Sequence, residues 1–229
     1  LERLKDISRT RNLTDNEVVL QQSLREYTDS QFSDLIKKVE SAKAIVRSQT
    51  FYEIDKLEWA VRIFHETTAA ISLVYNPARI SMPPVETDLT YKPFISSEIL
   101  NAVQDTQVNV YRDVFDHILK PAIEAEKPDV IGISIVLRQQ LFSSMTCCSM
   151  IKELYPDIHV TIGGNTVTRL RDVLPQTPNL FALFDSAVMF EGETALCRLV
   201  DAVGTNRDFS TIPNLIYKDP TGIHTSLVT

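Results

Sequence analysis

Small and polar residues follow four short apolar segments of the sequence, and their types are those that hold a ligand. The segments are residues 70–75, 129–136, 159–162 and 186–190. The residues at or after their ends are Asn76 to Arg79, Ser134 to Leu137, Gly163-Gly164-Asn165 and Glu191-Gly192-Glu193. Paired glycines let the backbone approach a ligand without interference from a Cβ atom, and free N–H groups where a helix begins can bond polar ligand atoms. The pattern favours a site for a large, amide-rich and weakly charged ligand.

The sequence lacks the motifs of several common kinds of site, which excludes those sites. It contains no G-x-G-x-x-G dinucleotide fingerprint, no G-x-x-x-x-G-K-[ST] phosphate loop, no H-E-x-x-H or C-x-x-C metal motif and no G-x-S-x-G nucleophile elbow. The three cysteines, Cys147, Cys148 and Cys197, are odd in number and include an adjacent pair, which does not fit a disulfide framework. Reduced thiols indicate a cytoplasmic protein. We predict no metal ligands and no catalytic residues.

Alternating strands and helices must position the candidate residues. The four apolar segments read as strands, and residues 97–126, 138–154, 167–184 and 194–203 read as helices. Residues 214–218 and 223–227 read as a hairpin. This alternation predicts the α/β class, with a doubly wound parallel sheet. In such sheets ligands bind outside the carboxyl ends of the strands, which is where the candidate residues lie.

The remaining sequence and the composition restrict the class of protein further. Apolar residues recur at helical spacing before the first strand, so we divide the chain into an N-terminal helical region (1–68), the sheet domain (69–204) and a hairpin or linker (205–229). The 229 residues are 44% hydrophobic and 23% charged, with a net charge of −7, which is typical of a folded protein. No basic run indicates nucleic-acid binding, and no apolar run reaches the roughly 18 residues of a membrane span.

Two short motifs resemble the S-x-L…G-G signature of cobalamin-binding domains. Ser134-x-Val136 is followed 27 residues later by Gly163-Gly164, with valine in the place of leucine. The surrounding sequence is similar to that of cobalamin-dependent radical S-adenosylmethionine (SAM) enzymes, in the segments Pro128 to Ser134, Gly163 to Asn165 and Glu191 to Glu193. The segment Tyr75 to Arg79 resembles the subgroup that modifies ribosomal peptides. The resemblance covers residues 70–218 and implies a Rossmann-like, flavodoxin-like fold.

The resemblance also implies roles for the candidate residues. In this family the nucleotide tail of cobalamin enters the sheet crevice, and the corrin ring rests on the carboxyl edge. Ser134 would bond the benzimidazole, glycines would pass close to the tail, and Asn76 and Arg79 would lie near the lower corrin face. The implied cofactor-binding residues are Asn76, Arg79, Ser134, Val136, Leu137, Gly163, Gly164, Asn165, Glu191, Gly192 and Glu193. We therefore expect Ser134→Leu and Gly164→Val to block the tail pocket without changing the fold.

Two motifs of this family are missing. The D-x-H-x-x-G motif, whose histidine binds cobalt in many cobalamin domains, has only an imperfect counterpart in Asp157 to Gly163, so we expect His159 to be an ordinary strand residue. The lower cobalt ligand is then absent, a water molecule, or a side chain such as Arg79. The C-x-x-x-C-x-x-C motif that holds a [4Fe–4S] cluster is missing as well. We expect a fragment without turnover of its own, joined in the whole protein to a C-terminal radical SAM domain that uses the cluster and SAM in methyl transfer or related chemistry, with a peptide as substrate.

Two other functions stay open at this point. A flavodoxin-like regulatory or interaction domain would keep the sheet but lose the ligand. An enzyme domain would bind another nucleotide in the same crevice. Retention of cobalamin by the purified chain distinguishes both from a cobalamin-binding module.

Overall fold

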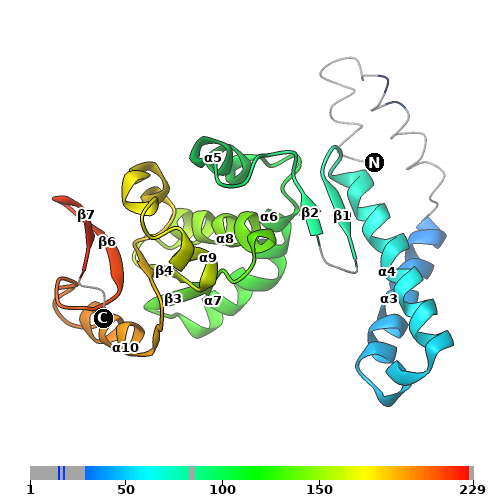
Figure 1. The fold of residues 1–229 in the computed structure, drawn as a ribbon. Helices are drawn as coiled ribbons and strands as arrows, with labels where there is room; N and C mark the ends of the chain where they lie inside the picture. The colour runs from blue at the N-terminus through cyan, green and yellow to red at the C-terminus, as the bar shows by residue number, and fades with distance from the viewer. Residues whose placement is uncertain (1–14, 16–17, 19–28, 83–85, 227–229) are drawn as a thin grey trace. The chain divides into compact units, whose positions relative to one another are not determined.

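The computed structural model describes Asp15, Val18, residues 29–82 and residues 86–226. The chain divides into two compact units, residues 1–90 and 91–229, and each is described by itself (Figure 1). The sequence-based domain bounds of 1–68, 69–204 and 205–229 stay predictions, and most of the helical region predicted before residue 29 lies outside the described residues. Within the described part, no helix is long and apolar enough to cross a bilayer.

The first unit contains a pair of helices and a small hairpin. Helix α3 (Asp29–Val46) leads through the 3-10 helix η1 (Gln49–Tyr52) into α4 (Ile54–Val74), and the antiparallel strands β1 (Arg79–Ser81) and β2 (Glu86–Asp88) follow. The two helices share a core of Ala42, Ala60 and Ile63, where the small alanine side chains permit close packing. The predicted helical region is thus confirmed over the residues of α3 and most of α4.

The predicted strand over residues 70–75 is wrong, because residues 70–74 continue α4. A short apolar run cannot be distinguished from a buried helix segment by its periodicity, and α4 contains no glycine or proline that would end it earlier. The hydroxyl of Ser72 donates to the Thr68 carbonyl, one turn back, at 2.7 Å, which satisfies a polar side chain within the helix. Asn76 and Arg79 therefore follow a helix rather than a strand.

Three helical segments precede the sheet of the second unit. They are α5 (Ser96–Gln104), α6 (Val110–Val114) and α7 (Lys120–Glu126), with a π-helix, η2 (Phe115–Leu119), between the last two. The buried Asn109 amide donates to the carbonyl of Ala102 in α5 and to the hydroxyl of Thr146, each at 2.8 Å. Because Thr146 belongs to helix α8 (Leu141–Leu154), this amide links α5 to α8. The helices predicted over 97–126 and 138–154 are confirmed.

Five strands form one sheet in the order β3-β4-β5-β6-β7. β3 (Val130–Ser134), β4 (His159–Gly163) and β5 (Ser186–Val188) are parallel. β6 (Leu215–Asp219) and β7 (Gly222–Thr225) form the predicted hairpin, but this hairpin belongs to the sheet, because β6 pairs with β5 in the antiparallel direction. The α/β, Rossmann-like fold is confirmed, with a mixed rather than fully parallel sheet.

Helices cover both faces of this sheet. On one face, Ile135 and Ile162 line a small apolar cavity together with Leu141 and Met145 of α8. On the other face, α10 (Glu193–Val203) packs Ala195 and Leu199 against β5 and β6, in a core with Val188, Leu215 and Tyr217. The short helices α9 (Asn165–Arg169), η3 (Arg138–Gln140), η4 (Leu174–Gln176) and η5 (Pro178–Ala182) complete the connections.

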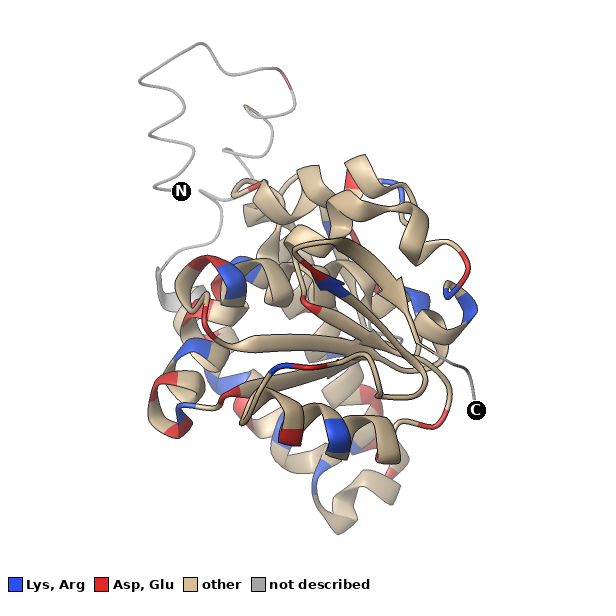
Figure 2. Ribbon diagram, turned by 90° about the vertical axis from the view of Figure 1, so that its left-hand side faces the viewer, with Lys and Arg blue, Asp and Glu red and all other residues tan. Residues whose placement is uncertain are grey.

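Strand β3 has a neighbour along only one of its edges in the described sheet. Its sequence, Val-Ile-Gly-Ile-Ser, is apolar on both faces and is typical of a strand inside a parallel sheet. Gly132 and Ser134 are nevertheless exposed. Charged residues lie mainly on helices and loops, whereas the strands carry few (Figure 2). β3 therefore presents an uncharged, open edge beside the candidate residues.

Candidate functional site

The three parallel strands bring most of the candidate residues to one edge of the sheet. Ser134 ends β3, Gly163 ends β4 and Val188 ends β5, and these strands run in the same direction. The segments that follow them start from the carboxyl edge, and they contain Val136, Leu137, Gly164, Asn165, Glu191, Gly192 and Glu193. This is the edge at which open α/β sheets bind their ligands.

Ser134 and Gly163 lie side by side on the face of the sheet that carries α10. They are partners in the parallel register, so their side-chain positions point to the same face. A Cβ atom at Gly163 would lie 3.8 Å from the Cβ of Val188, which packs against α10. Gly132 points the same way as Ser134, because side chains two residues apart in a strand share a face. We call Gly132, Ser134 and Gly163 the shelf: three small residues, of which the first two are exposed.

Gly164 serves the packing of two loops at this edge. Its φ is +96°, and a Cβ atom there would lie 2.9 Å from the Ile135 carbonyl oxygen and 3.0 Å from the Ile135 nitrogen. Ile135, the residue directly after β3, is itself hydrogen-bonded: its N–H donates to Gly163 O at 2.7 Å, and the Thr166 N–H donates to Ile135 O at 3.0 Å. The sequence predicted that the backbone of the glycine pair approaches a ligand closely. In the structure, the backbone of Gly164 lies close to the backbone of Ile135.

Two residues that the sequence analysis missed hold the loop after Ser134. Gln140 Oε1 accepts the N–H groups of Val136 and Leu137 at 2.8 and 2.9 Å, and Thr166 Oγ1 donates to Val136 O at 3.1 Å. The available signal was a glutamine at the third position of a helical turn, which reaches back to the preceding N–H groups as in a capping box. With their backbone fixed, Val136 and Leu137 keep side chains that are 49% and 59% exposed.

Glu191, Gly192 and Glu193 lead into α10, and the two glutamates border a hollow. Gly192 is the N-cap of α10, and Glu193 is its first residue, where a carboxylate interacts favourably with the helix dipole. Glu191 and Glu193 line a hollow of about 470 Å³ together with Arg198 and Asn214. Both glutamates are exposed, so they remain available to a ligand at the carboxyl edge.

The other candidate residues differ in where the structure places them. Asn165 is the first residue of α9 and is exposed. Asn76 and Arg79 belong to the first unit, after α4 and at the start of β1. The contact of Asn76 and Arg79 with the lower corrin face stays a prediction.

His159 lies at the opposite end of β4 from Gly163, at a distance of roughly 13 Å along the strand. Its imidazole is buried, and Nε2 lies 2.9 Å from Ser186 Oγ. Because Ser186 Oγ donates to Thr161 Oγ1 at 2.9 Å, it accepts from His159, and the imidazole carries its hydrogen on Nε2. His159 is therefore a buried strand residue, as predicted from the imperfect motif.

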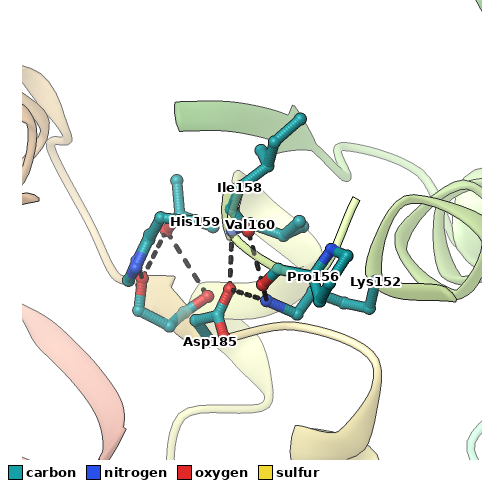
Figure 3. Close-up of polar contacts among 8 residues, drawn as sticks. Lys152, Pro156, Ile158, His159, Val160 and Asp185 are labelled. Carbon is teal, nitrogen blue, oxygen red and sulfur yellow. Dashed lines mark hydrogen bonds and ion pairs between the residues drawn. The ribbon is translucent and has the colours of Figure 1, made fainter. Parts of the chain in front are cut away.

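Asp185, next to this histidine, ties α8 to the beginnings of two strands (Figure 3). Its Oδ2 accepts from Lys152 Nζ at 2.9 Å and from the Val160 N–H at 2.8 Å. Lys152 also donates to the carbonyls of Pro156 and Ile158, at 3.0 and 3.1 Å. These polar groups satisfy one another, which indicates that this end of the sheet has a structural role.

The free energy of unfolding is expected to fall in mildly acidic solution because of His159. Burial lowers the pKa of its imidazole, Asp185 acts in the opposite direction, and Lys152 and Arg207 lower it further. Below about pH 6.5 the His159 imidazole is therefore protonated in the unfolded chain but not in the folded chain. The free energy of unfolding then decreases by up to about 1.4 kcal/mol per pH unit. Above that pH the contribution is fully present.

Urea unfolding of the chain across this pH range measures the effect. His159→Gln keeps an N–H donor for Ser186 but does not titrate, so its stability should fall less steeply than that of the wild type. Equal slopes for the two proteins would contradict the role assigned to His159.

The cysteines are distributed over two helices. Cys147 and Cys148 lie in α8, where the first is half-buried and the second is buried, and Cys197 is exposed on α10. Burial raises the pKa of Cys147 to about 11 and also raises that of Cys148, so both are protonated thiols at neutral pH. In the described part of the chain, no group of three or more His, Cys, Asp or Glu residues could hold a metal ion.

Comparisons with known proteins bear on this edge of the sheet. The family model described as "B12 binding domain" matches residues 98–200. Among solved structures, the radical S-adenosylmethionine methyltransferase TsrM from Kitasatospora setae, with tryptophan substrate and a SAM analog bound, is 21% identical, with a TM-score of 0.43. The match covers 52% of this chain and 23% of that one. None of the curated proteins compared matches the chain.

The region that matches the family model contains most of the site. It begins in α5 and ends in α10, and it contains the shelf, the loop after Ser134 and the segment from Glu191 to Glu193. Asn76 and Arg79 lie outside it. Residues 98–200 of the chain are thus similar to B12-binding domains, and this region contains most of the candidate residues.

Proposed function

We propose that this chain binds cobalamin at the carboxyl edge of β3, β4 and β5 and orients it for a radical SAM domain of the same protein. The observation that carries the proposal is the coincidence of the B12-binding family match with the shelf. The match covers only 23% of TsrM. The activity of the whole protein is therefore also a proposal.

The residues at this edge fit the nucleotide tail of cobalamin. Gly132, Ser134 and Gly163 leave the sheet surface low, so that a flat heterocycle can approach the strands. Among the described residues, no group bonds the exposed Ser134 hydroxyl, which is therefore free to bond a ring nitrogen. In this proposal the shelf receives the tail, while Val136, Leu137, Asn165 and Glu191 to Glu193 surround the cofactor.

Cobalamin, when bound, supplies methyl transfer or related radical chemistry, and the chain supplies its position. Gln140 and Thr166 fix the backbone of Val136, so the loop after β3 is in place before a ligand arrives. A preformed loop spares the ordering cost that binding otherwise carries.

We propose that no histidine of the second unit is the lower cobalt ligand. His159 is buried at the other end of β4 and bonds Ser186. His117 bonds the Asp113 carbonyl, and His224 in β7 bonds Asp219. Water, the contact by Arg79 or the absence of a lower ligand stay the alternatives.

The partner domain in this proposal is a radical SAM domain in cis, with a [4Fe–4S] cluster and SAM. The three cysteines of the chain cannot form its C-x-x-x-C-x-x-C motif, so the cluster would be bound elsewhere in the whole protein. The support is the sequence resemblance over residues 128–218. A peptide substrate and a cytoplasmic location are further predictions from the sequence.

Retention of the cofactor tests the proposal directly. The purified chain is mixed with hydroxocobalamin or methylcobalamin and passed through a gel-filtration column, and the visible spectrum of the protein peak is recorded. Corrin bands should elute with the protein at a ratio near one. Lys218→Gln is a matched control, because Lys218 is exposed at the opposite end of the sheet and should leave retention unchanged. A colourless protein peak would favour a regulatory domain that has lost its ligand.

A further inference from the structure

We propose that Phe190 is a contact residue of the cobalamin site, with its ring forming one wall beside the carboxyl edge. This inference rests on the proposed function and deepens it, because it names a binding residue that none of the sequence motifs contains.

Phe190 lies at the carboxyl edge and is exposed there. It comes two residues after the end of β5 and directly before Glu191. Its neighbour Met189 is 1% exposed and Val188 is 7% exposed, whereas Phe190 is 43% exposed. A large aromatic side chain therefore turns outward at the point where the strand leaves the core, among the residues assigned to the cofactor.

The backbone of Phe190 has a conformation that does not suit phenylalanine. Its φ is +56°, which lies in the left-handed region that glycine and asparagine adopt more readily. The Phe190 N–H donates to Thr168 Oγ1 at 2.8 Å, and this bond holds the conformation. A bulky residue kept at such a position is typical of functional sites, where the strain is retained for the placement of a side chain.

A cation holds the ring from the side of α9. The Arg171 guanidinium lies 5.7 Å from the centre of the Phe190 ring, within the range of a cation–π contact. Arg171 Nη1 also donates to Thr168 O at 3.2 Å. Thr168 thus supports both partners, through its hydroxyl to Phe190 and through its carbonyl to Arg171, and the ring is fixed before any ligand binds.

The chemistry of the ligand explains why a fixed aromatic ring is useful here. The corrin ring system is broad and flat, with methyl groups and amide side chains along its periphery. An aromatic side chain offers a large apolar contact area, and little conformational freedom is lost when it is already held in place. Val136 and Leu137, after β3, and Phe190, after β5, are all exposed apolar residues. In this proposal all three contact the cofactor.

Spectral titration with hydroxocobalamin measures the contribution of the ring. Phe190→Ala should raise the dissociation constant about tenfold, and Phe190→Tyr, which keeps the ring, should stay close to the wild type. Thr168→Val removes the acceptor for the Phe190 N–H and should weaken binding in the same direction. Val173→Ala is the matched control, because Val173 is an exposed apolar residue outside the proposed site and should not change the constant.

Phe190→Gly separates a binding role from a structural one. Glycine accepts the positive φ, so the unfolding temperature of the cofactor-free chain should be maintained while the dissociation constant for cobalamin rises about tenfold, as in Phe190→Ala. Wild-type affinity in Phe190→Ala and Phe190→Gly would overturn this inference and leave the proposed function intact. A wild-type chain that binds no cobalamin would overturn both.

Discussion

Replacing Gly164 with valine is expected to destabilise the second unit by roughly 3 kcal/mol, even without any cofactor. The residue has a φ of +96°, and a Cβ atom would lie within 3.0 Å of three backbone atoms of Ile135. The N–H and C=O of Ile135 are both hydrogen-bonded, so these backbone atoms cannot move aside as a flexible side chain can. Thermal unfolding of the cofactor-free chain, followed by circular dichroism, should show a midpoint lowered by about 10 °C.

Gly132→Ala is the control for this experiment. A Cβ atom at Gly132 would lie 3.7 Å from Thr161 Cγ2, which is an ordinary contact, and Gly132 has no positive φ. Alanine there should leave the midpoint unchanged or raise it slightly. If Gly164→Ala and Gly164→Val unfolded at the wild-type temperature, the close approach to Ile135 would not be a feature of the molecule. The expected loss of stability also corrects the sequence-based expectation that Gly164→Val spares the fold.

Ser134→Leu is expected to lower cobalamin affinity at least 100-fold while leaving the unfolding temperature nearly unchanged. Ser134 is exposed and shares a face with Gly132 and Gly163, so a leucine side chain would stand above the shelf without entering the core. The tail of the cofactor would then lose both its hydrogen-bond partner and its space. Gel filtration and spectral titration of the variant measure the loss.

Ser134→Ala divides this effect into its two causes. Alanine removes the hydroxyl but leaves the shelf open, so affinity should fall by only about tenfold. Equal losses for alanine and leucine would assign the whole effect to the hydrogen bond. Full retention by Ser134→Leu would show that the tail does not bind at the shelf.

The sequence predicted the sheet edge well, because the evidence was local. β-branched runs ending in Ser134 and Gly163 specify buried parallel strands, and parallel strands must bring their ends together. The strand prediction over residues 70–75 was wrong because it rested only on a short apolar run. Six apolar or small residues without a turn signal suit a helix as well as a strand. The side chains of Ala70, Ile71 and Val74 lie beside α3, and the sequence does not show such contacts.

The details of the site depended on contacts distant in sequence. Gly164 meets Ile135 across two loops, and Phe190 is supported by Thr168 and Arg171 from another connection. Neither contact produces a recognisable motif in the sequence, because the residues that make it are distant along the chain. The glycine pair was therefore assigned as a unit, whereas in the structure Gly163 belongs to the shelf and Gly164 to the packing between loops.

Within the described residues, no strand pairs with the outer edge of β3, and this has a consequence for the protein in concentrated solution. Its N–H and C=O groups can template the addition of a strand from another molecule, and natural proteins guard such margins with lysine, proline or a bulge. β3 contains none of these. The chain by itself should therefore be prone to self-association through this strand edge. A polypeptide that paired with the edge would prevent this aggregation and would also form a wall beside Ser134.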